Sequence, residues 1–148
     1  MFKFKISIFY TCKEYSINEA RYAASLFLNC DENELVFSNE TKNKLPLYYF
    51  ISKDGKTDVS ITKFGGYVEL FHKRLTPDEP KLSYDDAMQK AEFYLKEKHF
   101  DNMSPSYGFI SNGVATFNFA YNQDGVICYN DLIKVGVATD SGEIVSFS

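Results

Sequence analysis

Residues 117–135 read FNFAYNQDGVICYNDLIKV, and this stretch decides how the rest of the chain is interpreted. Residues 117–121 have aromatic side chains at alternate positions, which predicts a strand. The polar run at residues 122–125 predicts a turn that ends in glycine. A short apolar return follows at residues 126–129, and a strand restarts at Leu132. Because this stretch interrupts an internal duplication, we expect any local function to lie here.

The duplication begins with two helices that share one pattern. Ser16 and Glu19, and later Ser83 and Asp86, have the spacing of a capping box, in which a hydroxyl and a carboxylate satisfy the first backbone amides. The first helix is predicted over residues 17–29, and Asp86 should reach its cap less well than the longer Glu19. Each helix repeats a buried stripe of two alanines, an aromatic residue and a leucine. The stripes are Ala20, Ala24, Phe27 and Leu28, and then Ala87, Ala91, Tyr94 and Leu95.

Strands follow each helix. Residues 48–55 align with residues 107–113, and both segments end in the Gly-containing signal of a tight hairpin. Alternating strands are predicted next, over residues 57–62 and 114–121. The copies then diverge, because the second is longer by about nineteen residues, which is enough for an added strand.

The repeat predicts a division of the chain. Residues 1–14 are expected to form a leader or an edge strand, and the first unit spans residues 15–74. Residues 75–81 contain two prolines, which fix the backbone and favour a stiff linker. The second unit spans residues 82–148 and carries residues 117–135 as an inserted strand and turn.

Composition excludes several classes of function. The net charge is −4 and the pI is about 5.2, with scattered Lys and Arg, so a phosphate-binding surface for nucleic acid is not expected. No apolar run is long enough to span a bilayer, so no membrane segment is predicted in this chain. Aromatic residues make up 17% of the chain, all of them Phe or Tyr, which favours sheet.

Catalysis by a cysteine is the weakest of the functions considered. Cys12, Cys30 and Cys128 form no Cys-x-x-Cys pair, and their odd number argues against a disulfide framework, so buried thiols are expected. The histidines, His72 and His99, are the available bases. An apolar run surrounds Cys128 and would raise its pKa rather than activate it.

No cofactor or metal site is predicted. Metal binding needs clustered ligands, which two distant histidines and unpaired thiols do not supply. Residues 122–125 resemble part of a calcium loop, but the first ligand and the closing glutamate are missing, so a turn is expected. Gly65 and Gly66 lack the lysine and hydroxyl residue of a phosphate loop.

Two resemblances connect these patterns to known families. A helix opened by Ser-x-x-acidic-Ala, followed by a sheet whose last hairpin reads VATDSGEIV at residues 137–145, resembles a PepSY unit, and two such units occur. The tract from 102 to 135 and the ending GEIVSF at residues 142–147 resemble the C-terminal part of the YpeB family of sporulation and germination proteins. The similarity covers roughly residues 15–148, although Asn130 stands where proline is expected.

The resemblance implies a fold, a location and a partner. The fold would be α+β, with two tandem PepSY-like units, each one helix packed on a small antiparallel sheet. The protein would be non-enzymatic and extracytoplasmic, on the cortex side of the spore inner membrane, held there by a segment upstream. It would bind and stabilise, localise or restrain a SleB-type cortex-lytic hydrolase. PepSY units more broadly are associated with peptidase inhibition.

The expected partner-binding positions are polar residues beside aromatic ones. They are Tyr121, Asn122, Asp124, Tyr129, Asn130, Asp131 and Lys134. The alternatives are a ligand-binding domain for peptidoglycan fragments, in which Tyr121 or Tyr129 contacts the ligand, and a PepSY-type peptidase inhibitor. A third is an enzyme that uses Cys128 or His72. The sequence leaves the oligomeric state open.

Overall fold

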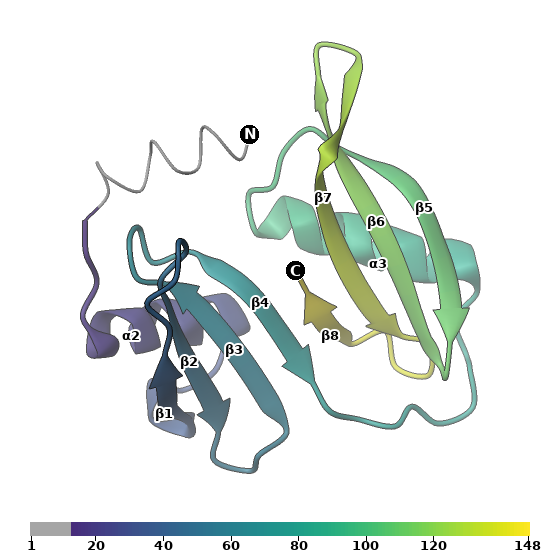
Figure 1. The fold of residues 1–148 in the computed structure, drawn as a ribbon. Coiled ribbons are helices and arrows are strands. Elements are labelled where there is room, and N and C mark those ends of the chain that lie inside the picture. Colours follow the sequence, from purple (N-terminus) through teal and green to yellow (C-terminus); the bar gives the residue numbers. More distant parts are fainter. Residues whose placement is uncertain (1–12) are drawn as a thin grey trace. The chain divides into compact units, whose positions relative to one another are not determined.

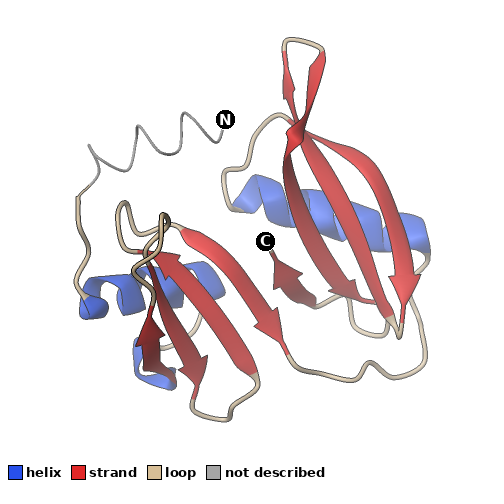
Figure 2. Cartoon of the chain, viewed as in Figure 1, coloured by secondary structure: helices blue, strands red, loops and turns tan. Residues whose placement is uncertain are grey.

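The computed structural model describes residues 13–148, apart from the side chains of residues 129–131. The chain divides into two compact units, residues 1–73 and residues 74–148. Each unit has one long helix and a four-stranded antiparallel sheet (Figures 1 and 2). The expected α+β fold with two tandem units is confirmed. Cys12 and most of the segment expected as a leader lie outside the described residues, and Glu14 forms an isolated bridge with Phe64.

The first unit forms one continuous antiparallel meander, in the order β1-β2-β3-β4. Its elements are α2 (Ile17–Leu28), the short 3-10 helix η1 (Glu32–Glu34), β1 (Leu35–Glu40), β2 (Leu47–Ser52), β3 (Thr57–Thr62) and β4 (Val68–Lys73). The helix packs on one face of this sheet, where Val59, Ile61 and Phe71 are buried. Burial of these apolar side chains supplies the main stabilisation of the unit.

The second unit repeats this arrangement with longer strands. Its elements are α3 (Tyr84–Glu97), β5 (Met103–Ser111), β6 (Val114–Gln123), β7 (Val126–Ala138) and β8 (Ile144–Phe147). The sheet order is β8-β7-β6-β5, with every neighbouring pair antiparallel. Helix α3 packs on the face that carries Phe117, Val135 and Val137, all of them buried.

Both helices begin with the predicted capping boxes. In α2 the backbone N–H of Ser16 donates to the Glu19 carboxylate at 2.8 Å, and the corresponding bond in α3, from Ser83 to Asp86, is 3.2 Å long. The shorter aspartate therefore reaches its cap less closely, as predicted. Helix α2 ends at Leu28 because Asn29 adopts a left-handed conformation with φ of 55°.

The predicted alanine stripes face the sheets. Small side chains let a helix approach a sheet closely, and the stripe alanines are completely buried: Ala20, Ala24, Ala87 and Ala91. The aromatic positions are half-buried and make edge contacts. Phe27 lies 6.2 Å from Phe71, and Tyr94 lies 6.4 Å from Phe147, measured between ring centroids. Leu28 is only half-buried, so the stripe of α2 is narrower than expected.

Residues 117–135 lengthen a hairpin rather than give the second unit an extra strand. They span the end of β6, its turn and most of β7. Both units have four strands in the described part of the chain, because the first unit also contains β1, a strand that was not expected. Strand β1 was not predicted from the sequence, because this edge strand buries only Leu35 and its second half is polar.

The proline-containing segment at residues 75–81 is attached to the second unit. The backbone N–H of Lys81 donates to Thr139 O at 2.9 Å, and that of Asp78 donates to Asp140 Oδ2 at 2.8 Å. The bond from Asp78 holds the pKa of Asp140 below its ordinary value. Pro77 lies against Gly113, where a Cβ atom would come within 2.9 Å of the proline ring.

No helix within residues 13–148 is long and apolar enough to cross a membrane.

Candidate functional site

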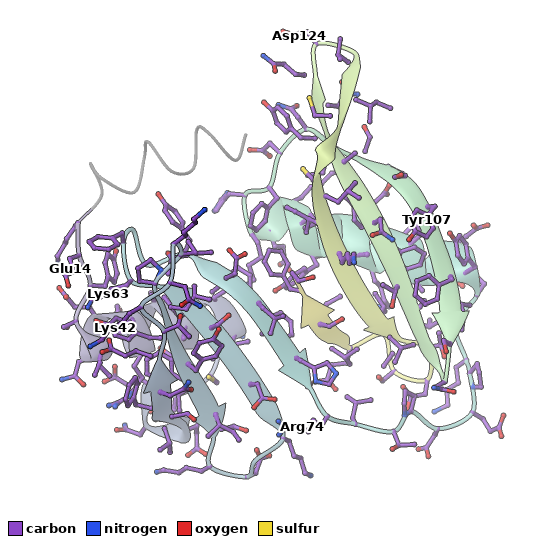
Figure 3. All side chains as sticks on the ribbon, in the orientation of Figure 1. Glu14, Lys42, Lys63, Arg74, Tyr107 and Asp124 are labelled. Carbon is purple, nitrogen blue, oxygen red and sulfur yellow. The ribbon has the colours of Figure 1, made fainter. Side chains whose placement is uncertain are left out.

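The β6–β7 hairpin is closed by a two-residue turn. Gln123 pairs with Val126, and the residues between them, Asp124 and Gly125, have φ angles of 51° and 89°. Two consecutive positive φ angles are typical of the type I′ turn, which matches the twist of the strands and favours Asp-Gly. A turn was predicted at residues 122–125, and the structure limits it to Asp124 and Gly125. Asp124 lies at the tip of the hairpin (Figure 3).

A bulge separates the tip of this hairpin from the sheet below. Ala120 pairs with Leu132, but the next residue, Tyr121, pairs with Cys128. Residues 129–131 of β7 therefore have no counterpart on β6, which increases local twist and redirects the strands. Beyond the bulge the hairpin extends past the remaining strands of the second unit (Figure 1).

A polar hollow lies at the base of the tip. Its volume is about 450 Å³. The lining residues are Asn102, Ser104, Tyr121, Asn122, Gln123, Asp124 and Gly125. The lining therefore combines amide, hydroxyl and carboxylate groups with one aromatic ring. Such a lining can form several directed hydrogen bonds with a ligand or with a partner's polar side chains.

Asn122 holds this hollow together. Its backbone N–H donates to Asn102 O at 2.7 Å, and its side-chain Nδ2 donates to Ser104 Oγ at 3.3 Å. Its Oδ1 accepts a 2.9 Å hydrogen bond from the N–H of Gly125 in the turn. One side chain thus connects β5, β6 and the turn, which fixes the tip with respect to β5.

The structure brings together part of the predicted site. Tyr121, Asn122 and Asp124 line the hollow, whereas Lys134 is exposed farther along β7, opposite Asn118. The remaining predicted positions, Tyr129, Asn130 and Asp131, form the bulge, and their side chains lie outside the described part of the structure.

Three residues that were not predicted from the sequence complete the lining: Asn102, Ser104 and Gln123. Two of these come from β5 and the residue before it, and pairing of Met103 with Tyr121 places them beside the hairpin. A sequence signal was present, since Asn102 follows the helix and has a φ of 58°, a conformation that asparagine tolerates. This signal could not place Asn102 beside the hairpin without the register between β5 and β6.

The two described cysteines are less buried than expected. Cys128 is half-buried, and Cys30 is exposed, so the expectation of buried thiols is wrong for Cys30. Cys30 follows the left-handed Asn29 and donates its N–H to Ser25 O at 3.0 Å, which places it at the helix end, outside the core. Partial burial, followed by the nearby charge of Asp31, raises the pKa of the Cys30 thiol.

The two histidines are exposed and belong to different units, His72 to the first and His99 to the second. His72 is in β4, paired with Asp58, and His99 lies just beyond α3 with a φ of 60°. Among the side chains that the structure describes, those of residues 13–128 and 132–148, no three His, Cys, Asp or Glu groups lie close enough together to hold a metal ion.

Comparison with known proteins identifies the family. Residues 9–148 match the model of a protein family described as YpeB sporulation, PepSY1 and PepSY2 domains. The chain belongs to the YpeB family. The PepSY1 and PepSY2 domains of that description agree with the two units of the fold, and the similarity to YpeB expected from the sequence is confirmed.

Two sporulation proteins named YpeB illustrate the relationship. The chain is 29% identical over 133 residues to YpeB of Halalkalibacterium halodurans, a match that covers 87% of this chain and 30% of the relative. It is 28% identical over 144 residues to YpeB of Bacillus subtilis, covering 92% of this chain and 32% of the relative. The chain thus spans about a third of the length of these curated relatives.

A solved structure shows the same fold. The C-terminal domain of Bacillus megaterium YpeB superposes with a TM-score of 0.79 and 24% sequence identity, covering 92% of this chain and 63% of that chain. Membership of the YpeB family supports a role in sporulation.

Proposed function

We propose that this chain is a non-enzymatic protein-interaction module that binds a SleB-type cortex-lytic hydrolase and stabilises, localises or restrains it. The module would act in sporulation and germination, outside the cytoplasm and on the cortex side of the spore inner membrane. Membership of the YpeB family supports a sporulation role. The surface of the hairpin tip supports binding of a protein.

The β6–β7 hairpin tip is the observation that carries this proposal. Val126 and Ile127 are 66% and 41% exposed at the tip, next to the polar hollow that Tyr121 and Asp124 line. Exposed apolar side chains beside polar groups are typical of protein interfaces, where an apolar centre is bordered by hydrogen-bonding residues. The bonds of Asn122 hold this tip in place before a partner binds, which reduces the entropy lost on association.

The candidate contact residues follow from this surface. The central candidates are Tyr121 and Asp124, with Val126 and Ile127 as apolar contacts. The further candidates are Tyr129, Asn130, Asp131 and Lys134.

Binding of the chain to a purified SleB-type hydrolase tests the proposal. We expect saturable binding in titration calorimetry and slower proteolysis of the hydrolase when it is bound. Tyr121→Ala and Ile127→Ala should each weaken binding about tenfold or more, as at interface positions where a buried side chain is truncated. Phe93→Ala is the matched control, because Phe93 is 63% exposed on α3 and is not among the residues that line the hollow at the hairpin tip.

Two outcomes would contradict the proposal. If the intact chain neither binds the hydrolase nor changes its stability or activity, the proposed function is wrong. If it binds but the hairpin variants and Phe93→Ala have equal effects, the hairpin is not the contact surface.

Binding of peptidoglycan fragments is a second candidate, and the hollow favours it. A volume of about 450 Å³ is in the range of small-molecule sites. The ring of Tyr121 and the amides of Asn102 and Gln123 are groups that can contact the apolar face and the hydroxyls of a sugar. Muropeptide titration monitored by NMR tests this candidate. Shifts confined to the hollow and lost in Tyr121→Ala, without any binding of the hydrolase, would favour the sugar ligand.

A further inference from the structure

Strand β5 leaves one edge of the second unit's sheet open. It pairs with β6 on one side, and among the strands within residues 13–148 it has no other partner (Figure 1). Ser111 and Val114 close a two-residue turn in which Asn112 and Gly113 have positive φ angles, so this pair exchanges hydrogen bonds.

The direction of the free backbone groups follows from that closing pair. Hydrogen-bonded and non-bonded pairs alternate along an antiparallel ladder. Phe109 and Tyr107 therefore direct their N–H and C=O groups toward β6, whereas Gly108 and Ile110 direct theirs toward the open edge. These outward donors and acceptors can pair with another extended strand.

This edge is apolar and carries no charge. Exposed edge strands usually avoid pairing by carrying lysine or other charged residues, yet the sequence of β5, MSPSYGFIS, has none. Pro105 and the bulge after it interrupt the first half of the strand and leave residues 107–111 as the available edge. Large exposed side chains flank that edge: Tyr107 at 59%, Phe109 and Ile110 at 49% each, and Tyr84 at 38%. Tyr107 is marked on the sheet in Figure 3.

We propose that the edge formed by residues 107–111 of β5 pairs antiparallel with the same edge of a second copy of this chain. A two-fold axis at Phe109 places each Gly108 opposite Ile110 of the second copy, so that all four outward-facing residues exchange backbone hydrogen bonds. The two Phe109 side chains meet directly across the axis, as a non-hydrogen-bonded pair whose Cβ atoms are about 5 Å apart.

The side chains of β5 fit this self-pairing. Gly108 has no Cβ, and the Tyr84 hydroxyl lies 2.8 Å from where a Cβ would stand, so the ring of Tyr84 lies beside the glycine. The Ile110 side chain of the second copy, opposite Gly108, can pack on that ring. Because β5 has no charged residue, the paired strands themselves place no like charges opposite each other.

The small size of this edge predicts a weak dimer. Five paired residues bury less than the roughly 1,200 Å² of a standard stable interface, so association should depend on protein concentration. We therefore expect monomer at low micromolar concentration and measurable dimer near the millimolar range.

Register-specific crosslinking of the full chain tests this inference. In a background with Cys12, Cys30 and Cys128 changed to Ser, Phe109→Cys places two thiols across the axis, within reach of a disulfide after small adjustment. The matched control is Ile110→Cys, because Phe109 and Ile110 are equally exposed at 49%. In the proposed register, the thiol introduced by Ile110→Cys faces Gly108 of the second copy rather than the same thiol, beyond the reach of a disulfide.

We expect Phe109→Cys to form the disulfide dimer about tenfold faster than Ile110→Cys under mild oxidation. Mixed Tyr107→Cys and Ser111→Cys chains should also crosslink with each other, because these positions face one another in the same register. Sedimentation equilibrium of the chain without cysteine should show a dimer that Ile110→Lys removes, with unchanged circular dichroism. Equal crosslinking of the two single-cysteine variants would overturn the proposal. A strictly monomeric chain near millimolar concentration, or pairing of this edge only with a different protein, would also overturn it.

Discussion

Asn122→Ala tests whether one side chain fixes the hairpin tip. The substitution removes the bond from Nδ2 to Ser104 Oγ at 3.3 Å and the bond from the N–H of Gly125 to Oδ1 at 2.9 Å. Each bond contributes about 0.5–1.5 kcal/mol, so local opening of the tip should become easier by about 1–2 kcal/mol. The N–H of Gly125 then exchanges with solvent about tenfold faster.

The position of the tip predicts that this loosening stays local. The bulge at residues 129–131 separates Asn122 from the buried Phe117 and Phe119, so the amides near these rings should lose protection only through the fall in global stability, which is at most the roughly 1–2 kcal/mol removed at the tip. Hydrogen exchange by NMR measures the tip, and urea unfolding measures the whole unit. Asn122→Asp is the matched control, because it keeps the acceptor for Gly125 and should retain most of that amide's protection. Unchanged exchange at Gly125 in Asn122→Ala would refute the assigned role.

Three further predictions concern the helices and the core. Ser83→Ala removes the acceptor for the Asp86 N–H at 3.1 Å and should lower the free energy of unfolding by about 1 kcal/mol in urea. A hydrogen bond from Lys13, and next the backbone N–H of Ser16, lowers the pKa of Glu19 to about 2 from an ordinary value of 4.5. The folded state thus gains stability from this carboxylate above pH 4.5 and loses it as the pH falls toward 2, which NMR titration of Glu19 and acid unfolding of Glu19→Gln can check. Phe119→Ala removes a completely buried ring and should cost about 3–5 kcal/mol, measured by thermal or urea unfolding; a cost below about 1 kcal/mol would contradict its place in the core.

The helices and turns were predictable because their signals are local. Ser16 and Ser83 satisfy amides only three residues away, and Asp124 and Gly125 need only their own backbone angles to close a hairpin. Such interactions depend on the identity of a few neighbouring residues. The alanine stripe was predictable for the same reason, since helical periodicity places its members on one face.

The features that could not be predicted depend mostly on pairing between segments that are distant in the sequence. The hollow needs Asn102 beside Asn122, and this contact follows from the register of β5 on β6, which composition does not encode. Strand β1 was missed because only Leu35 is completely buried, so alternation is weak. The exposure of Cys30 follows from the position at which α2 ends, one residue before Asn29.

The bulge divides the β6–β7 hairpin into a buried part and an exposed part, and this division bears on the proposed binding. Below it, Phe117 and Phe119 are completely buried and anchor β6 to the core of the second unit. Above it, Val126 and Ile127 are exposed and make no contribution to that core. Substitutions in the tip can therefore change binding at little cost in stability, whereas substitutions below the bulge unfold the unit. If Ile127→Ala weakens binding and leaves the unfolding midpoint unchanged, Ile127 is a contact residue. A variant that lost binding because it unfolds would instead show a lower affinity and a lower unfolding midpoint.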